Sequence, residues 1–247
     1  MCWGLLEACT RQVLDLANEL RLWVILGSTH RLTGRHKPHD SVYIIDDRGR
    51  IIDRYDKMFC SGDHKGRTGD LLHYSPGNHF TVFDLKGIRC GLLICYDYAF
   101  PEVYREYKRR GVQLMFHSYN AGHASRKRVK AVQHEIGTRF CGLNRGSSFP
   151  EIRMPSTMQA SAGNNHIWIS CSNTSARETC FPSFFVRADG IITGRLRRNR
   201  SGVLSTAVDT NERLYDGTAD WRNRAMRGVF HSGDIVRDRR SDDRTRL

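Results

Sequence analysis

The chain has 247 residues, of which 39% are hydrophobic and 26% charged, and its formal net charge is +13. A chain of this length can bury a sizeable core, as one large domain or two small ones, and its 6 prolines are too few for a disordered or low-complexity protein. The mean hydropathy is −0.52. The sequence has no apolar run of about 18 residues, which excludes a membrane-spanning helix.

The positive charge raises the question of nucleic acid or another anionic partner. Much of the excess lies in two late stretches, RLRRNR at 195–200 and RDRRSDDRTRL at 237–247. Neither zinc-finger spacing nor an aromatic RNA-binding signature accompanies them. We therefore interpret the two stretches as a solvated basic face and a loose end, and the sequence argues against nucleic-acid binding.

Eight cysteines at irregular spacings, with no CxxC pair, argue against a disulfide framework. Cys90 and Cys171 lie within apolar runs and are expected to be buried thiols. The first residues, MCWGLLEACTRQ, lack the basic and apolar regions of a signal peptide. We therefore expect a cytoplasmic protein. The scattered histidines show no metal-ligand spacing, so neither a metal nor a cofactor is implied; these are His64, His73, His79, His117 and His123.

The first half of the chain mixes helix and strand. Apolar residues at helical spacing predict a helix at about 3–20, and LWVILGS predicts a buried strand. SVYIIDDRGRIIDRYDK predicts a hairpin with its turn at 47–49, followed by a long polar loop at 59–79. HFTVFDLKGIRCGLLICYD predicts two more strands, before a helix at about 101–110 and the strand VQLMFHS.

In the second half, residues 122–165 are expected to be largely helical with an irregular middle, NRGSSFPEIRMPS. HIWISCSN predicts a strand, SFFVRADGIITGRL a strand–turn–strand unit, and GVLSTAVD a closing strand. This order predicts a layered α/β fold with a mixed sheet or two packed sheets. We expect one domain at 1–232 and a basic, loose tail at 233–247.

The segment GLLICYDYAFPE, residues 91–102, carries the first chemical signal. An apolar strand brings Cys95 to its carboxyl end, and Pro101 opens a helix. A side chain at such an elbow reaches the crevice where α/β proteins bind ligands, so the thiol could be a nucleophile. Taken alone, a cysteine after an apolar strand is more often a small buried hydrophobe.

Lys57, at the end of the predicted hairpin, is the second signal. A lysine there is ordinarily a solvated charge. Beside a thiol, however, an ammonium stabilises a thiolate and can stabilise an oxyanion.

Together these segments resemble the nitrilase superfamily of carbon–nitrogen hydrolases. Its "Y-x-K" lysine stands here as Tyr55-Asp56-Lys57, and its "G-x-x-I-C-Y-D-x-x-F-P-E" elbow as Gly91 to Glu102. SPGNHFTVFD, RADGIITG, SAGNNHIW and WRNRAMRGVFHSG are similar to further family segments, so the resemblance covers nearly the whole chain.

The resemblance implies a four-layer α-β-β-α sandwich and a Glu-Lys-Cys triad. Cys95 would attack an amide, carbamoyl or nitrile carbon and form an acyl-enzyme, while Lys57 and the Tyr96 backbone N–H would stabilise the oxyanion. Asp97 and Glu102 would orient the elbow. Asp70 matches a further family glutamate and would orient Lys57. Tyr119 and Asn120 are candidates for the substrate pocket, or are simply part of a loop.

The pattern departs from the family at the first residues. The family's general base is a glutamate after a first strand, and that strand precedes the helix predicted at 3–20. We therefore expect an N-terminally incomplete fold that lacks this base; Glu7 lies inside the helix and does not fit. Either the sequence is a truncated reading of a longer gene, which the intact context of Cys95 and Lys57 favours, or it is a shortened homologue.

Several functions stay open at this point. Tyr-Asp after the cysteine favours a hydrolase of a linear amide or N-carbamoyl compound, and a nitrile hydrolase of the same fold is an alternative. An inactive homologue that serves as a non-catalytic subunit is a third possibility. The resemblance also implies a homodimer or higher homo-oligomer. The substrate's acyl and amine parts would be set by residues 59–79 and 122–155.

Overall fold

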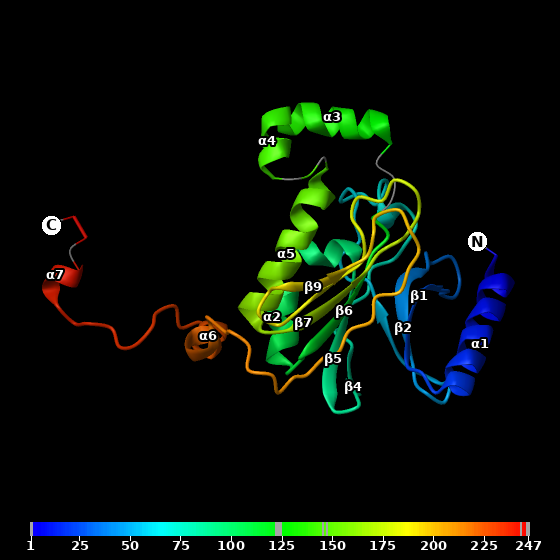
Figure 1. Ribbon diagram of the computed structural model, residues 1–247, viewed down its shortest axis with the longest axis horizontal. Coiled ribbons are helices and arrows are strands. Elements are labelled where there is room, and N and C mark those ends of the chain that lie inside the picture. The colour runs from blue at the N-terminus through cyan, green and yellow to red at the C-terminus, as the bar shows by residue number, and fades with distance from the viewer. Residues whose placement is uncertain (1, 122–124, 145, 147, 243, 246–247) are drawn as a thin grey trace.

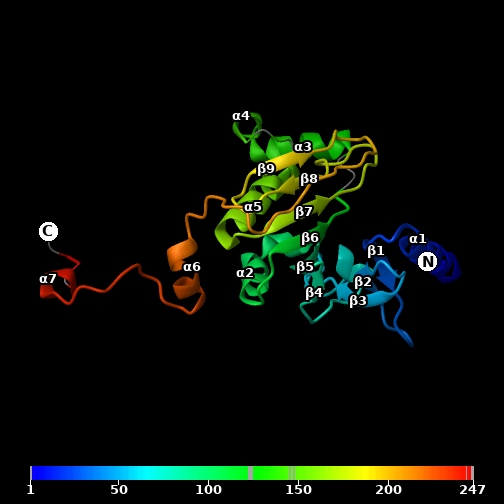
Figure 2. The same ribbon diagram turned by 60° about the horizontal axis from the view of Figure 1, so that its bottom comes forward.

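Two β-sheets lie face to face between layers of helices. A computed structural model of the chain describes residues 2–121, 125–144, 146, 148–242 and 244–245. Helix α1 covers the outer side of the smaller sheet, and α2 and α5 cover the outer side of the larger one (Figure 1, Figure 2). This order confirms the layered α/β fold, with helix, sheet, sheet and helix in succession.

The smaller sheet is an antiparallel meander of β1 (Val24–His30), β2 (His39–Ile45) and β3 (Ile51–Asp56), preceded by α1 (Trp3–Leu20). The β2–β3 turn passes against α1 at Gly49, where φ is +72°. A Cβ at Gly49 would collide with the Leu14 carbonyl oxygen. Only glycine accepts both the close approach and the left-handed backbone at little cost, so Gly49 allows the helix to lie on the sheet.

The larger sheet has six strands in chain order. Its strands β5, β6 and β7 are parallel, and the outer pairs β4–β5, β7–β8 and β8–β9 are antiparallel. The strands are β4 (Val82–Leu85), β5 (Ile88–Ile94), β6 (Leu114–Ser118), β7 (Trp168–Ser172), β8 (Phe184–Val186) and β9 (Ile192–Arg195). Because parallel strands end at the same edge, the residues that follow β5 and β6 are brought together there.

The helices of the larger layer connect these strands. Helix α2 (Pro101–Arg109) joins β5 to β6, and α3 (Arg126–Ile136), α4 (Thr138–Leu143) and α5 (Phe149–Asn165) lie between β6 and β7. Tyr107 on α2 is buried and donates its hydroxyl to the Leu92 carbonyl at 2.6 Å. The core is continuous across the two sheets, because Val42 and Tyr55 belong to the same buried cluster as Leu92.

The predicted irregular middle at 144–156 is wrong for its second part, because α5 begins at Phe149. The Ser148 hydroxyl accepts a hydrogen bond from the Glu151 N–H at 3.3 Å, which caps the helix. Pro155 lies inside α5 and cannot donate a backbone hydrogen bond. The buried stripe Met154, Met158 and Ala162 nevertheless has helical spacing, and its packing prevails over the proline.

The closing strand predicted for GVLSTAVD, residues 202–209, does not form in the described part of the chain. Leu204 and Val208 are partly buried against the core, while the backbone between them is not paired in a ladder. The apolar residues of this segment therefore reflect packing of Leu204 and Val208 against the core without a strand. In the polar loop at 59–79 the chain forms a short 3-10 turn, η1 (Asp70–Leu72).

The last part of the chain runs away from the sheets (Figure 1). It contains α6 (Ala219–Met226) and α7 (Arg239–Asp242). Residues 122–124, 145 and 147 of the predicted helical stretch, which include His123, and residues 243 and 246–247 of the predicted tail lie outside the described residues.

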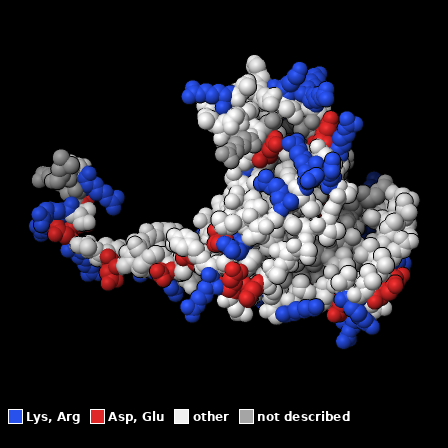
Figure 3. Space-filling model, in the orientation of Figure 1, with Lys and Arg blue, Asp and Glu red and all other residues white. Residues whose placement is uncertain are grey.

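Lys and Arg side chains gather at the end of the molecule where α3 lies (Figure 3). Exposed Arg126, Lys127 and Lys130 on α3 contribute to this charge. In the described residues, no helix combines the length and the apolar character needed to cross a membrane.

Candidate active site

Cys95 stands at the elbow between β5 and the 3-10 turn η2 (Cys95–Ala99). Its φ is +44°, a conformation that is rare for a residue with a side chain. Residues held in this region cluster at functional sites, where the surrounding structure imposes them. The elbow therefore presents a half-buried thiol in a fixed direction at the edge where β5 and β6 end.

The buried side chain of Asp97 holds this elbow in place. Its fully buried carboxylate accepts the Ile94 and Phe59 backbone N–H groups, each at 2.9 Å, and the Tyr55 hydroxyl at 2.8 Å. These donors come from β5, from the loop after β3 and from β3 itself, so Asp97 joins the two sheets. Burial raises the pKa of Asp97 to about 6, against the effect of the three hydrogen bonds. Such contacts suit the elbow-orienting role predicted for Asp97.

Lys57 directly follows β3. Its side chain lies near Cys95, between the two sheets, in a region that we call the seam. Its side chain is 2% exposed, and its ammonium lies 2.5 Å from Asp70 Oδ2 and 3.7 Å from Asp40 Oδ2. The loop at 59–79 closes back on this lysine, because the Gly77 N–H donates to the Lys57 carbonyl at 2.8 Å. The structure thus brings Asp70 to Lys57, as the sequence predicted, and adds a second carboxylate.

The charges at this position favour a cationic lysine. Burial opposes the charge, but Cys95, Asp70 and Asp40 outweigh it and raise the pKa of Lys57. Burial likewise opposes the charge on Asp70, yet hydrogen bonds from Lys57 and the Ser61 N–H lower its pKa. Lys57 and Asp70 are therefore an ammonium and a carboxylate at neutral pH.

Burial raises the pKa of the Cys95 thiol, although Lys57 and a hydrogen bond from the Asn120 backbone N–H act in the opposite direction. The resting side chain is consequently a thiol at neutral pH. A nucleophilic role would need a group that takes up its proton.

The other predicted site residues lie at different distances from this seam. Asn120 approaches the Cys95 sulfur through its backbone N–H, while its side chain is exposed. Tyr96 is 39% exposed, its ring lies edge-on to Phe100, and its backbone N–H follows Cys95 directly. Tyr119 is 7% exposed and donates its hydroxyl to Met158 Sδ at 3.0 Å, so its phenol belongs to the core.

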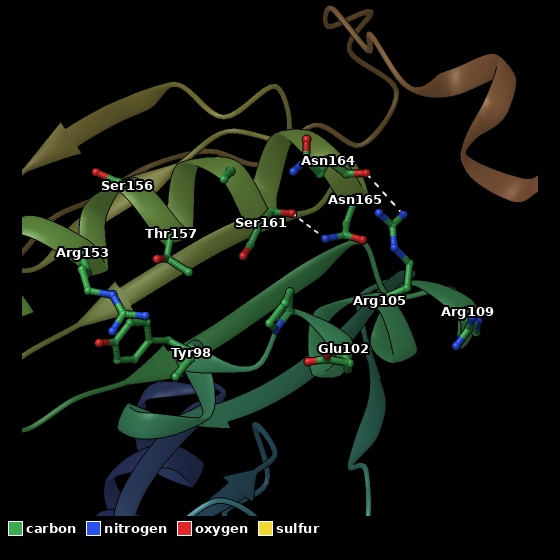
Figure 4. A pocket seen from close by; sticks show the side chains of 13 residues that line it. Tyr98, Glu102, Arg105, Arg109, Arg153, Ser156, Thr157, Ser161, Asn164 and Asn165 are labelled. Atoms are coloured by element: carbon green, nitrogen blue, oxygen red, sulfur yellow. Dashed lines mark hydrogen bonds between the residues drawn. The ribbon is translucent and has the colours of Figure 1, made fainter. Parts of the chain in front are cut away.

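Glu102 lies away from the seam. It stands in the first turn of α2 and lines a pocket of about 700 Å³ between α2 and α5. Figure 4 shows Glu102 and Arg105 on the α2 side of this pocket, with Ser161 and Asn165 on the α5 side. The structure therefore joins Cys95, Lys57, Asp70 and Asp97, and it places Glu102 on an outer face.

Sequence reasoning missed Asp40 and His117. His117, on β6, is buried between the Cys95 carbonyl oxygen at 3.2 Å and the Tyr104 hydroxyl at 2.7 Å. Burial lowers its pKa to about 3, so the ring is neutral, and its Nε2–H can donate to the elbow. A histidine next to the last residue of an apolar strand was the available signal. For Asp40 the sequence has no such signal, because the predicted hairpin begins at Ser41 and an unshifted register would place Asp40 opposite Asp56.

In the described residues, no three or more His, Cys, Asp or Glu side chains are grouped so that they could hold a metal ion.

The sequence is similar to those of known amidases. The chain is 33% identical over 109 residues to the deaminated glutathione amidase of Dictyostelium discoideum, which covers 41% of this chain and 37% of that protein. It is 34% identical over 80 residues to the 2-oxoglutaramate amidase of Bacillus subtilis, covering 32% and 29%. The matched part spans about two fifths or less of these relatives.

The fold has solved counterparts. An amidase of the nitrilase superfamily from Nesterenkonia AN1 matches with a TM-score of 0.58 and 19% identity, over 77% of this chain and 63% of that one. The profile of the carbon–nitrogen hydrolases matches residues 4–213, which is well over half of the chain. The chain therefore belongs to the carbon–nitrogen hydrolase family.

Proposed function

We propose that the protein hydrolyses the carbon–nitrogen bond of a small linear amide or N-carbamoyl compound through an acyl-enzyme on Cys95. The observation that carries this proposal is the buried Lys57–Asp70 ion pair beside a thiol held at a strained elbow. A cation fixed in a poorly hydrated seam can stabilise an oxyanion strongly, because it needs no reorganisation when that charge develops.

The proposed reaction has two steps. The Cys95 sulfur forms a bond to the carbonyl carbon, the carbon–nitrogen bond breaks, and the amine leaves with a proton. Water then adds to the thioester, which releases the carboxylic acid and restores the thiol. Lys57 and the Tyr96 backbone N–H stabilise the oxyanion in both steps, while Asp70 and Asp97 hold Lys57 and the elbow in place.

The names of the relatives guide the choice of substrates. Deaminated glutathione and 2-oxoglutaramate are amides named for relatives of this chain, and butyramide has been bound to a mutant of the Nesterenkonia amidase. We propose this class of small amide for the chain. A nitrile is the less favoured alternative, since Tyr-Asp after Cys95 resembles the amide branch.

The test combines covalent labelling with product analysis. In a solved structure of a glutamate-to-glutamine mutant of the Nesterenkonia amidase, the acetamide moiety of fluoroacetamide is bonded to the active-site cysteine. Intact-mass measurement after fluoroacetamide treatment should show one such adduct on the wild-type chain and none on Cys95→Ala. Cys9→Ala, which removes an exposed thiol of α1, is the control and should keep the adduct.

Product release from the three amides completes the test: ammonia from 2-oxoglutaramate and butyramide, and the free amine cysteinylglycine from deaminated glutathione. We expect release by the wild-type chain and by Cys9→Ala, and none by Cys95→Ala. Consumption of a matched nitrile with no amide turnover would establish the nitrile alternative. Absence of both reactions, with a correctly folded chain, would favour a non-catalytic subunit.

We also propose that the protein forms a homo-oligomer through the face made by α2 and α5. Exposed Glu102 from α2 and exposed Arg153 from α5 line the pocket of Figure 4 on this face. In a two-fold pair, the acidic side chain of one copy can face the basic side chain of the other. Light scattering should give a mass above 28.4 kDa for the wild-type chain. A monomeric mass at micromolar concentration would contradict this proposal.

The compartment we propose is the cytoplasm. All eight cysteines, which lie within the described residues, are free thiols, as a reducing compartment would keep them. Cell fractionation with an antibody against the chain tests this assignment.

A further inference from the structure

Lys57 is held by two carboxylates that differ in their surroundings. Asp70 Oδ2 lies 2.5 Å from the ammonium and also accepts the Ser61 backbone N–H at 3.0 Å. Asp40 Oδ2 lies farther away, 3.7 Å from the same ammonium, although both carboxylate side chains are 27% exposed. Asp70 is thus committed to holding Lys57, whereas Asp40 has room to change its protonation.

The two carboxyl groups also differ as bases. Burial raises the pKa of Asp40, against the pull of Lys57, while hydrogen bonds lower the pKa of Asp70 despite its burial. A carboxylate with a raised pKa takes up a proton more readily near neutral pH. Lys57 cannot take up a proton itself, because its own pKa is raised and it already is an ammonium.

From this geometry we infer that Asp40 is the positioning residue that holds the proton lost by Cys95, received through Lys57. In this step the thiol proton passes to Lys57 Nζ as Lys57 passes one of its protons to Asp40. A thiolate, an ammonium and a neutral carboxylic acid result, and the total charge is unchanged. The proton returns by the same route to the leaving amine. This inference rests on the proposed function, because that reaction provides the amine.

The position of Asp40 is fixed by the backbone. The Lys57 N–H donates to the Asp40 carbonyl at 2.9 Å, which continues the β2–β3 ladder by one residue. Between Ile44 and Ile45 the register shifts by one residue. Without this bulge Asp40 would face Asp56; with it, the residue opposite Asp40 is Lys57. Bulges are known to redirect side chains beside active sites.

The test compares Asp40→Asn with Asp40→Glu. Asp40→Asn keeps the size of the side chain but cannot hold a proton, and Asp40→Glu restores a carboxyl group. The matched control is Asp53→Asn, on the exposed face of β3. Two readouts are measured for each variant: the kcat for ammonia release from the best amide, and the rate of fluoroacetamide labelling at Cys95 by intact mass.

We expect Asp40→Asn to lower kcat about 10²-fold or more, with KM within about threefold of the wild-type value. Labelling should slow as well, because the Cys95 sulfur bonds to fluoroacetamide only after it loses the proton that Asp40 is proposed to hold. Asp40→Glu should recover at least about tenfold of the lost kcat, and Asp53→Asn should match the wild type.

Each contrary result points to a different failure. A wild-type chain with no turnover of amides overturns the proposed function, and this inference with it. Wild-type turnover that Asp40→Asn leaves unchanged overturns the role of Asp40 alone. When Asp40→Asn loses both turnover and labelling, as expected, Asp40→Glu decides: recovery of both supports the inference, and recovery of neither overturns it.

Discussion

The seam between the two sheets and the outer face of α2 and α5 both contain paired charged side chains, but the pairs of the outer face, such as Arg109 with Glu106, are more exposed than Lys57. In the seam, Lys57 is 2% exposed and paired with Asp70, and Asp97 is fully buried with three donors. On the outer face, Arg109 and Arg153 are exposed.

This difference in burial gives the same residue types different physical effects in the two regions. A buried ion pair fixes charges in a place where water cannot screen them, which suits chemistry. Exposed pairs contribute only about 0–1 kcal/mol and are screened by salt, which suits reversible association. Substitutions in the seam should therefore change catalysis and pH dependence, whereas substitutions on the outer face should leave catalysis unchanged.

The largest effect is expected from Lys57→Met, which removes the buried cation. Loss of one oxyanion-stabilising group lowers kcat about 10²–10³-fold, and here the partner of Asp70 is lost as well. Ammonia release under steady-state conditions measures the effect. Lys65→Met, an exposed lysine in the loop that follows, is the control and should retain wild-type activity. Near-normal turnover by a folded Lys57→Met chain would remove Lys57 from the mechanism.

The second prediction concerns pH and Asp97. Because the pKa of Asp97 is raised from 3.8 to about 6 on folding, the neutral form is favoured in the folded state. Its stabilising contribution is full below pH 3.8 and is lost as the pH rises through about 6. This shift corresponds to about 3 kcal/mol of unfolding free energy.

Urea denaturation between pH 4 and pH 7 tests whether the contribution of Asp97 to the unfolding free energy falls as the pH rises. The unfolding free energy of the wild-type chain should fall with rising pH relative to that of Asp97→Asn, which does not titrate. Asp84→Asn, an exposed carboxylate on β4, should follow the wild-type curve. Parallel curves for the wild type and Asp97→Asn would show that burial does not shift this group.

Sequence patterns were sufficient to predict the elbow at Cys95 and the layers of the fold. They were insufficient to predict which carboxylates surround Lys57. Cys95 and Lys57 lie in motifs whose local geometry follows from a strand, a turn and a proline-led helix. Asp40 meets Lys57 only because the β2–β3 register shifts at Ile44 and Ile45. A single-residue shift changes every partner beyond it, and no turn residue in the sequence marks this one. The prolines around α5 misled for a similar reason, since tertiary burial of Met154 and Met158 prevails over local preference.

A smaller effect is expected from Tyr55→Phe. The substitution removes the hydroxyl that donates to Asp97 at 2.8 Å and leaves a buried carboxylate with one donor fewer. Such a loss costs about 1–3 kcal/mol of unfolding free energy, and a displaced elbow should lower kcat about tenfold. Tyr43→Phe, on the neighbouring strand β2, provides the comparison, because its hydroxyl contacts His30 and not Asp97. Equal losses of unfolding free energy in the two variants would show that the hydrogen bond from Tyr55 to Asp97 does not stabilise the elbow.

The smallest effect is expected from Glu102→Gln, and it tests the boundary between the two regions. By family resemblance Glu102 orients the elbow, yet the structure places it on the outer pocket with Arg105. If the place of Glu102 on the outer face determines its role, the variant should keep kcat within about twofold of the wild type. Its unfolding free energy should stay within about 0.5 kcal/mol of the wild-type value. The association state measured by light scattering is then the property that responds, since Glu102 faces the surface proposed for a second copy. A drop in kcat comparable to that of Tyr55→Phe would extend the catalytic network through η2 to the start of α2, and the two regions would no longer be independent.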